Sequence, residues 1–140
     1  MIKIFACDKA FADCMKISVG YACQRCHVIY GPKHQGLHLS HYISRGNWSV
    51  RHHPDNGFVH CYGCHAHLGS RPAEFTSWVI DRSGFARHEI LIELARDTAR
   101  GRRARREKKE IAKFYRDQLF AFQGRRDKGE MGNFMVMAYD

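Results

Sequence analysis

Two cysteine pairs of the form C-x2-C constrain the fold of this chain more than any other feature. The first pair is Cys23 and Cys26, and the second is Cys61 and Cys64. Both sulfurs of such a turn can reach one metal ion, and two turns together supply the four tetrahedral ligands that structural Zn2+ favours. The sequence therefore predicts a structural zinc site that ties two distant segments together. The alternatives are a redox role for the thiols and a ligand set in which a neighbouring histidine replaces a cysteine.

Bulk composition limits the class of protein and of partner. With 140 residues, 44% of them hydrophobic, the chain suits one small domain with appendages, and a core of this size gains from a metal staple. The formal net charge of +9 favours a polyanionic partner, either nucleic acid or an anionic membrane surface. No apolar run approaches about 18 residues and no signal peptide is visible, so we expect a cytoplasmic protein without a membrane span. Cys7 has no assigned role.

The region around the cysteine pairs carries strand, loop and helix signals in a definite order. Residues 37–44 (LHLSHYIS) are predicted as a strand, and residues 45–57 as a loop rich in turn formers. A short strand, FVHC, then leads into the second cysteine pair. The expected fold class is α+β. The other predicted elements are helices over 8–17, 72–82 and 86–99 and, over 133–140, a short strand or a docking tail.

Three polar residues stand out in this arrangement. His41 is central on the first strand, Asn56 ends the loop and His65 follows the last cysteine. A histidine on a strand is more often structural than catalytic, but a strand, a loop, a strand and a helix that carry His, Asn and His in this order have the organisation of a ββα-metal site. Arg45 and Arg51 flank the loop. We expect them to be phosphate clamps, which a forked guanidinium suits, or else solvated charges.

From about Asp8 to Leu94 the chain resembles the HNH endonucleases, and among them the phage Rap/NinG recombination nucleases. The segments that carry the resemblance are YACQRCH, GLHLSHYISRG, PDNGFVHCYGCHAHLGS and PAEFTSWVIDRSG. The resemblance implies a small zinc-stapled ββα-metal core with flanking helices and a basic C-terminal helix. The expected organisation is an HNH nuclease domain over 1–95, a basic helical extension over 96–128 and a tail over 129–140.

The resemblance also implies a role for each polar residue. His41 matches the general base that activates a water against a phosphodiester, and a neutral histidine suits that work. Asn56 matches the central Asn, which orients the histidine-bearing loop or binds the metal. His65 matches the last His, a ligand of a single divalent ion. Mg2+ or Mn2+ is the expected catalytic ion, and Zn2+ or Ni2+ is the alternative.

The chain departs from the family pattern at two positions. Many HNH enzymes carry a metal-binding Asp where this chain has Ser40, and Rap/NinG relatives often carry Asn where this chain has His65. The first departure leaves the ligands of the catalytic ion open. The substitutes to consider are His38, Asp55 and Asn56.

The positive charge is concentrated in residues 96–128, which hold 13 Lys and Arg against 5 Asp and Glu. Apolar residues recur there at helical spacing, so the segment is predicted to be a basic amphipathic helix that Gly101 separates from the helix before it. Its apolar stripe should pack on the core or on a second copy. A solvated helix face and a membrane-surface helix are the alternatives to DNA binding. The residues expected to contact DNA phosphates are Arg102, Arg103, Arg105, Arg106, Lys108 and Lys109.

These observations predict a metal-dependent endonuclease that hydrolyses DNA phosphodiester bonds. The resemblance implies branched or recombination DNA, such as a Holliday junction, as the substrate, and a phage protein in a bacterial host cell. A homodimer would suit an enzyme that cuts two strands. The alternative from another class is a zinc-stabilised DNA-binding module without catalysis, which would need the cysteines but neither His41 nor His65. An RNA-binding protein is the third hypothesis.

Overall fold

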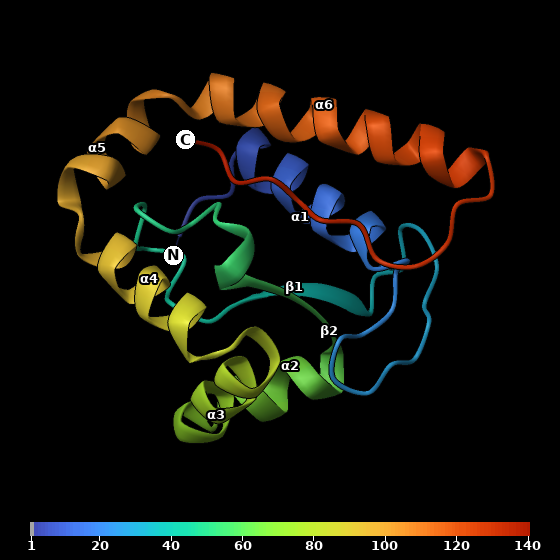
Figure 1. Cartoon of the computed structure of the whole chain (residues 1–140), viewed down its shortest axis with the longest axis horizontal. Coiled ribbons are helices and arrows are strands. Elements are labelled where there is room, and N and C mark those ends of the chain that lie inside the picture. Colours follow the sequence, from blue (N-terminus) through green and yellow to red (C-terminus); the bar gives the residue numbers. More distant parts are fainter. Residues whose placement is uncertain (1) are drawn as a thin grey trace.

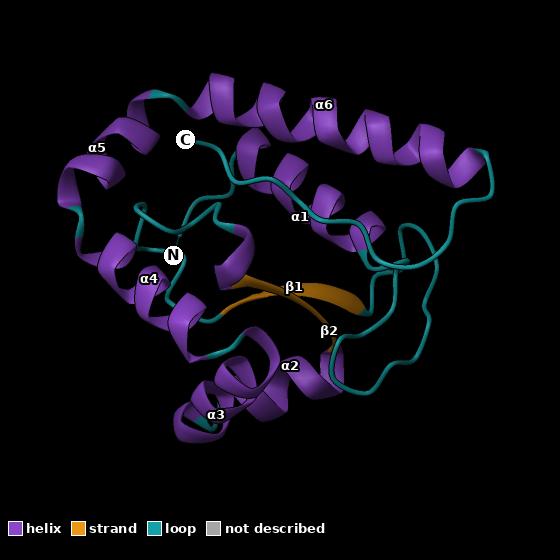
Figure 2. Cartoon of the chain, viewed as in Figure 1, coloured by secondary structure: helices purple, strands orange, loops and turns teal. Residues whose placement is uncertain are grey.

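An antiparallel hairpin lies at the centre of the computed structural model, which describes residues 2–140 (Figures 1 and 2). Strand β1 (Leu37–His41) pairs with β2 (Gly57–Cys61) so that the first residue of β1 faces the last residue of β2. The connection between them ends in a short 3-10 helix, η1 (Pro54–Asn56), and helix α2 (Tyr62–Gly69) begins directly after β2. The predicted order of strand, loop, strand and helix is therefore confirmed, and the fold is α+β.

Helix α1 (Ala6–Ser18) covers one face of the hairpin, and α6 (Lys108–Asp127) packs along α1, so that the two helices and the hairpin form the main core (Figure 1). Phe11, Cys14 and Tyr115 are fully buried between them. Asp8, the third residue of α1, stabilises the start of the helix, because its carboxylate accepts the backbone N–H of the N-cap residue Phe5 at 2.7 Å. This bond fixes the direction in which the chain enters α1.

Helices α2, α3 (Pro72–Ser83) and α4 (Phe85–Arg96) lie on the other side of the hairpin (Figure 1). Pro72 begins α3, where its missing N–H costs nothing, and Gly84, with φ of 87°, separates α3 from α4. A second, smaller core fills the space between these helices and β2. It consists of Phe58, Leu68, Phe75 and Val79.

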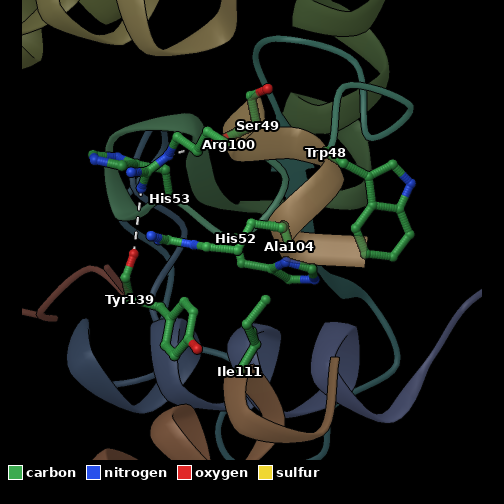
Figure 3. Close-up of a pocket in the computed structure, with 9 residues that line it drawn as sticks. Trp48, Ser49, His52, His53, Arg100, Ala104, Ile111 and Tyr139 are labelled. Carbon is green, nitrogen blue, oxygen red and sulfur yellow. Dashed lines mark hydrogen bonds between the residues drawn. The ribbon is translucent and has the colours of Figure 1, made fainter. Parts of the chain in front are cut away.

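The basic segment forms two helices, α5 (Thr98–Arg106) and α6, with the break at Glu107. The predicted interruption at Gly101 is wrong, because Gly101 lies inside α5. A Cβ there would be 2.8 Å from Ser49 Oγ, so glycine allows α5 to pack against the loop (Figure 3). The apolar stripe of α6 is buried in the core of the same chain. None of the helices within residues 2–140 combines the length and the apolar character of a membrane span.

Residues 129–140 form no strand and run in extended conformation along α1 and α6 (Figure 1). The backbone N–H of Phe134 donates to Ser18 O at 2.8 Å. The ring of Phe134 lies 3.9 Å and 3.8 Å from the guanidinium carbons of Arg125 and Arg126. Gln118 then bonds both backbone groups of Met137, at 3.0 Å and 2.8 Å. Of the two predictions for this segment, the docking tail is confirmed.

Two glycines inside helices provide a test of the packing of α5. Gly101→Ala should destabilise the fold by about 1–3 kcal/mol, because the added methyl overlaps Ser49. Gly124→Ala in α6 is the matched control, since a Cβ there meets nothing within 4 Å. It should stabilise the fold by about 0.5–1 kcal/mol through helix propensity. Urea unfolding measures both, and equal stabilisation by the two substitutions would contradict the contact between α5 and the loop.

Candidate functional site

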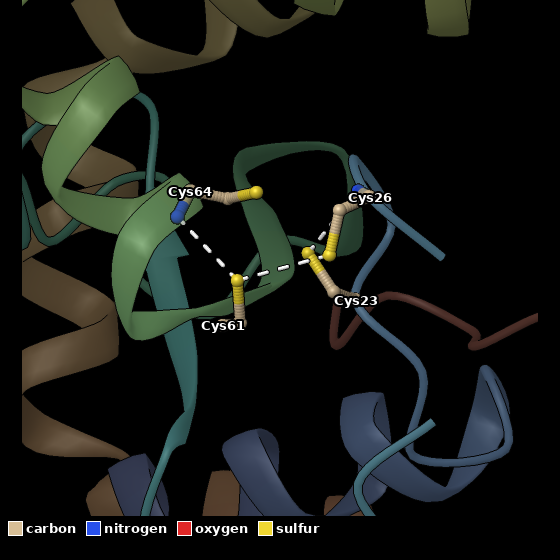
Figure 4. Close-up of side chains that lie close together, drawn as sticks. All are labelled: Cys23, Cys26, Cys61 and Cys64. Atoms are coloured by element: carbon tan, nitrogen blue, oxygen red, sulfur yellow. Dashed lines mark hydrogen bonds between the residues drawn. The ribbon is translucent and has the colours of Figure 1, made fainter. Parts of the chain in front are cut away.

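The four predicted cysteines meet at one point between the loop after α1 and the junction of β2 with α2 (Figure 4). Their sulfurs all lie within 4.8 Å of one another, and Cys26 Sγ is 3.8 Å from Cys61 Sγ. No histidine belongs to this cluster, so His27 and His65 replace no cysteine in it. The geometry confirms the predicted four-sulfur set, which could hold structural Zn2+.

The surroundings of the sulfurs suit thiolate ligands. The N–H of Cys26 points at Cys23 Sγ at 3.5 Å, the N–H of Cys64 points at Cys61 Sγ at 3.4 Å, and Arg25 Nη1 lies 3.4 Å from Cys64 Sγ. Burial alone would raise the pKa of Cys61, but the donors around its sulfur lower it to about 6. Burial raises the pKa of Cys64 to about 12. Since four thiolates repel one another, a divalent cation is needed to keep the whole set deprotonated.

His41 ends β1 on the face that packs toward α1. Its Nε2 lies 3.0 Å from the backbone oxygen of Arg51. A carbonyl oxygen only accepts hydrogen bonds, so Nε2 carries the proton and Nδ1 presents a lone pair. Burial, assisted by the charge of Arg45, lowers the pKa of His41 to about 4. His41 is therefore neutral at pH 7 and has the form that a proton acceptor requires.

Asn56 is completely buried and holds the loop between the strands together. Its Oδ1 accepts the N–H of Ile43 at 2.6 Å, and its Nδ2 donates to Ile43 O at 3.0 Å and to Val50 O at 3.1 Å. Because the amide is fully buried and its three bonds all go to the loop backbone, the geometry favours the role of orienting the loop over that of binding the metal.

His65 does not converge with His41 and Asn56 as expected. It lies on α2, and its Nδ1 is 3.0 Å from the Nδ1 of His38 on β1. Because side chains alternate along a strand, His38 and His41 point to opposite faces of the hairpin, about 10 Å apart along it. The structure thus forms two separate groups. His41 contacts the loop that Asn56 holds together, and His65 contacts His38.

The geometry of His38 suits a metal ligand. Its Nε2 lies 3.2 Å from Gln35 O, and donation to that carbonyl leaves the Nδ1 lone pair facing His65. The two imidazole nitrogens are at hydrogen-bond distance, 3.0 Å, and two lone pairs at this separation would also allow both to bind one ion at an angle of about 90°. Of the substitutes suggested by Ser40, His38 is therefore the one that fits. The sequence marks His38 only as one of three substitutes and does not indicate its partner, because His65 on α2 is brought close only by the fold.

The other substitutes and Ser40 itself have structural partners. Ser40 Oγ is 2.8 Å from His60 Nδ1, and both residues are buried. His60 Nε2 is buried without a hydrogen-bond partner among residues 2–140. The carboxylate of Asp55 forms an ion pair with Arg87. Ser40 and Asp55 are therefore engaged elsewhere, whereas His60 lies opposite His38 in the strand register, on the same face of the hairpin.

Arg51 is not a phosphate clamp and not a solvated charge, so both predictions for it are wrong. Its side chain is 1% exposed and makes a bidentate ion pair with Asp8, at 2.8 Å and 2.7 Å. His52 Nε2 contacts the same carboxylate at 2.7 Å, and the Arg51 guanidinium lies 4.2 Å from the ring of Trp48. Burial opposes ionisation of Asp8, but the hydrogen bonds from Arg51 and His52 hold its pKa well below the usual range. Nothing in the local sequence marks Arg51 as buried.

The remaining predicted cations lie on the surface. Arg45 makes no salt bridge within residues 2–140 and lies close enough to His41 to lower the pKa of that histidine. Arg105 and Lys108 lie over the ring of Trp48, at 5.2 Å and 5.3 Å from its centroid. Arg103 is partly neutralised by Glu107, at 3.8 Å. The exposed members of the predicted set are Arg102, Arg105, Arg106 and Lys109.

Zinc content tests the sulfur cluster. Purified protein should contain about one zinc ion per chain, and Cys61→Ser should abolish binding because three sulfurs hold the ion much less tightly. Cys14→Ala is the control, since Cys14 is equally buried but lies in α1 outside the cluster. Elemental analysis of the two variants measures the difference. Full zinc content in Cys61→Ser would contradict the ligand set.

Unfolding at several pH values tests the pair of Asp8 and Arg51. Asp8→Asn should lower the free energy of unfolding by about 3–5 kcal/mol at pH 7, because it leaves a buried guanidinium unpaired. Since the pKa of folded Asp8 is depressed, its contribution is complete above the unfolded pKa of about 3.9 and is lost at lower pH. The difference from wild type should therefore shrink as the pH falls from 5 toward 2. Asp13→Asn, in an exposed pair with Lys9, should change stability by less than about 0.5 kcal/mol.

Comparison of the chain with protein-family models, with curated proteins and with solved structures finds no match. The candidate site is therefore defined by the geometry of this chain alone. It comprises a four-sulfur cluster, a neutral histidine bonded to a loop carbonyl, and a histidine pair on the opposite face of the same hairpin.

Proposed function

We propose that the chain is a metal-dependent endonuclease of the HNH type that hydrolyses DNA phosphodiester bonds. The observation that carries this proposal is the state of His41, whose Nε2–H is bonded to Arg51 O and whose pKa is lowered to about 4. A histidine held in one tautomer and kept neutral at pH 7 is suited to accept a proton from water. It also stands in the strand, loop, strand and helix order that the HNH resemblance implies.

In this proposal His41 Nδ1 takes a proton from a water molecule as the water oxygen attacks phosphorus. The P–O bond to the leaving oxygen then breaks, and the leaving oxygen is protonated from solvent. Arg45 stabilises the negative charge that develops on the phosphate oxygens. Asn56 keeps the loop in place so that Arg51 O continues to orient His41.

His38 and His65 are the residues that would hold the divalent ion. Two imidazoles without a carboxylate favour Zn2+ or Ni2+ over Mg2+ and Mn2+, which reverses the order of preference expected from the resemblance. When bound, such an ion supplies positive charge for a phosphate. The ion would lie away from His41, because His38 and His41 point to opposite faces of β1.

The basic surface of α5 and the start of α6 supports DNA as the substrate. Its exposed Arg and Lys side chains would neutralise several phosphates without reading the sequence. The resemblance to recombination nucleases makes branched DNA the substrate to test first. Binding should weaken steeply as salt concentration rises, because bound phosphates release their counterions.

A zinc-stabilised DNA-binding module without catalysis is the second candidate. The observation in its favour is that His41 and His65 do not meet at a common metal, while the sulfur cluster and the basic helices are complete. Such a module would bind DNA and leave it intact. Catalysis by His41 is the property that separates the two candidates.

Cleavage assays test the proposal directly. Wild type should nick plasmid or cut a four-way junction with Mn2+, Ni2+ or Mg2+, and His41→Ala should reduce the rate by about a hundredfold or more while DNA affinity is retained. His34→Ala, an exposed histidine of the loop before β1, is the control and should leave the rate unchanged. Binding without cutting by wild type would support the non-catalytic module. Cutting that His41→Ala leaves intact would exclude His41 as the base, and preference for RNA would favour the RNA-binding hypothesis.

A further inference from the structure

The segment after α6 ends on two arginines of α5. Asp140 Oδ1 lies 3.3 Å from Arg100 Nη1 and 3.8 Å from Arg103 Nη2. The two arginines are three residues apart on one helix, so their side chains share a face. Figure 3 shows Arg100 beside Ser49 and Tyr139. A carboxylate therefore already lies at this pair of guanidinium groups.

Arg100 is held in place before any ligand arrives. Its Nε donates to Ser49 O at 2.9 Å and its Nη2 to Tyr139 O at 3.3 Å, and its side chain is 17% exposed. Nη1 is the part of the guanidinium that remains for an anion. Arg103 is less constrained, at 40% exposed, and it also contacts Glu107 at 3.8 Å. The fixed guanidinium of Arg100 and the less constrained guanidinium of Arg103 could together bind the oxygens of one oxyanion.

A small cavity lies beneath these arginines (Figure 3). Its volume of about 20 Å³ is enough for one water molecule. His52 Nδ1 is among the buried polar atoms without a partner in residues 2–140, and a water in the cavity would satisfy it. The lining combines polar side chains, among them Ser49, His52, His53 and Arg100, with the apolar side chains of Trp48, Ala104 and Ile111.

Asp140 is held near the two arginines but is not locked between them. Tyr139 is anchored by its N–H, which donates to Tyr115 Oη at 3.2 Å, and by its hydroxyl, which donates to Glu107 at 2.5 Å. The side chain of Asp140 itself is 87% exposed. An ion pair to so exposed a carboxylate is weak and is screened by salt. Asp140 is therefore present at high local concentration, yet another anion can displace it.

We propose that Arg100 and Arg103 form a phosphate-binding site, and that Asp140 occupies it when no nucleic acid is bound. Carboxylate and phosphate oxygens bind guanidinium groups in the same way, so DNA must displace Asp140 to use both arginines. The regulatory part of this inference rests on the proposed DNA binding. Exposed Arg102 and Arg106 on the same helix would extend the contact to neighbouring phosphates.

Two variants of equal charge test the proposal. Asp140→Asn and Glu130→Gln each remove one negative charge from an exposed residue of the same segment, but Glu130 pairs with Arg125 at the far end of α6, at 2.7 Å. At about 50 mM salt, Asp140→Asn should bind duplex DNA about two- to fivefold more tightly than wild type. Glu130→Gln should change affinity by less than about 1.5-fold, since only the general charge has changed. Fluorescence anisotropy measures both, and the difference should narrow at about 200 mM salt.

The arginine side is tested with Arg103→Gln. In the Arg103→Gln background, Asp140→Asn should no longer increase the affinity for DNA, because one of the two arginines that Asp140 covers is already missing. Equal tightening by Asp140→Asn and Glu130→Gln would show an effect of net charge alone and overturn the proposal. If the protein binds DNA but Asp140→Asn does not increase its affinity, the phosphate-site proposal is also overturned, while the proposed function is unaffected.

Inorganic phosphate separates this site from the proposed function. In 15N-labelled protein, phosphate should shift the Nε–H signal of Arg100 at lower concentration in Asp140→Asn than in wild type. This shift is expected even if the chain neither binds nor cuts DNA, in which case the proposed function fails and the anion site remains. No shift in either protein would overturn the anion site.

Discussion

The buried ion pair between Asp8 and Arg51 is the interaction on which the rest of the site depends. It joins the first turn of α1 to the loop between the strands, and its position is fixed by two hydrogen bonds and by the ring of Trp48. The backbone oxygen of the same Arg51 orients His41. A side chain that is buried for stability thus holds in place the carbonyl that decides which nitrogen of His41 is free to accept a proton.

Two other sets of interactions stabilise the same hairpin, one at each of its ends. Asn56 ties the loop end together through the backbone of Ile43 and Val50. The sulfur cluster holds the opposite end, where Cys61 pairs with Leu37. A sheet of only two strands is marginal by itself in water, and clamps at both ends explain how it can carry a histidine at a defined orientation.

Local patterns were sufficient for part of this structure. The C-x2-C spacing predicted the four sulfurs that meet, and the strand and turn signals placed His41 on β1 before the loop. The missed features depend on long-range contacts. Arg51 is buried because Asp8 reaches it from another element, and His38 meets His65 only after α2 packs on the hairpin. A glycine inside a helical pattern predicts a helix break, but at Gly101 the small residue allows the close approach of Ser49.

The hydroxyl of Tyr115 gives these parts a common frame. From the middle of α6 it donates to the backbone oxygen of His52 in the loop, and it accepts the N–H of Tyr139 at 3.2 Å. Burial raises the pKa of this phenol, so it stays protonated and keeps donating across the physiological range. One side chain therefore joins α6, the loop between the strands and the segment after α6. Under the proposed function, DNA bound along α5 would meet His41 at a fixed distance, so the cleaved bond would lie a constant number of nucleotides from the phosphates held by the helix.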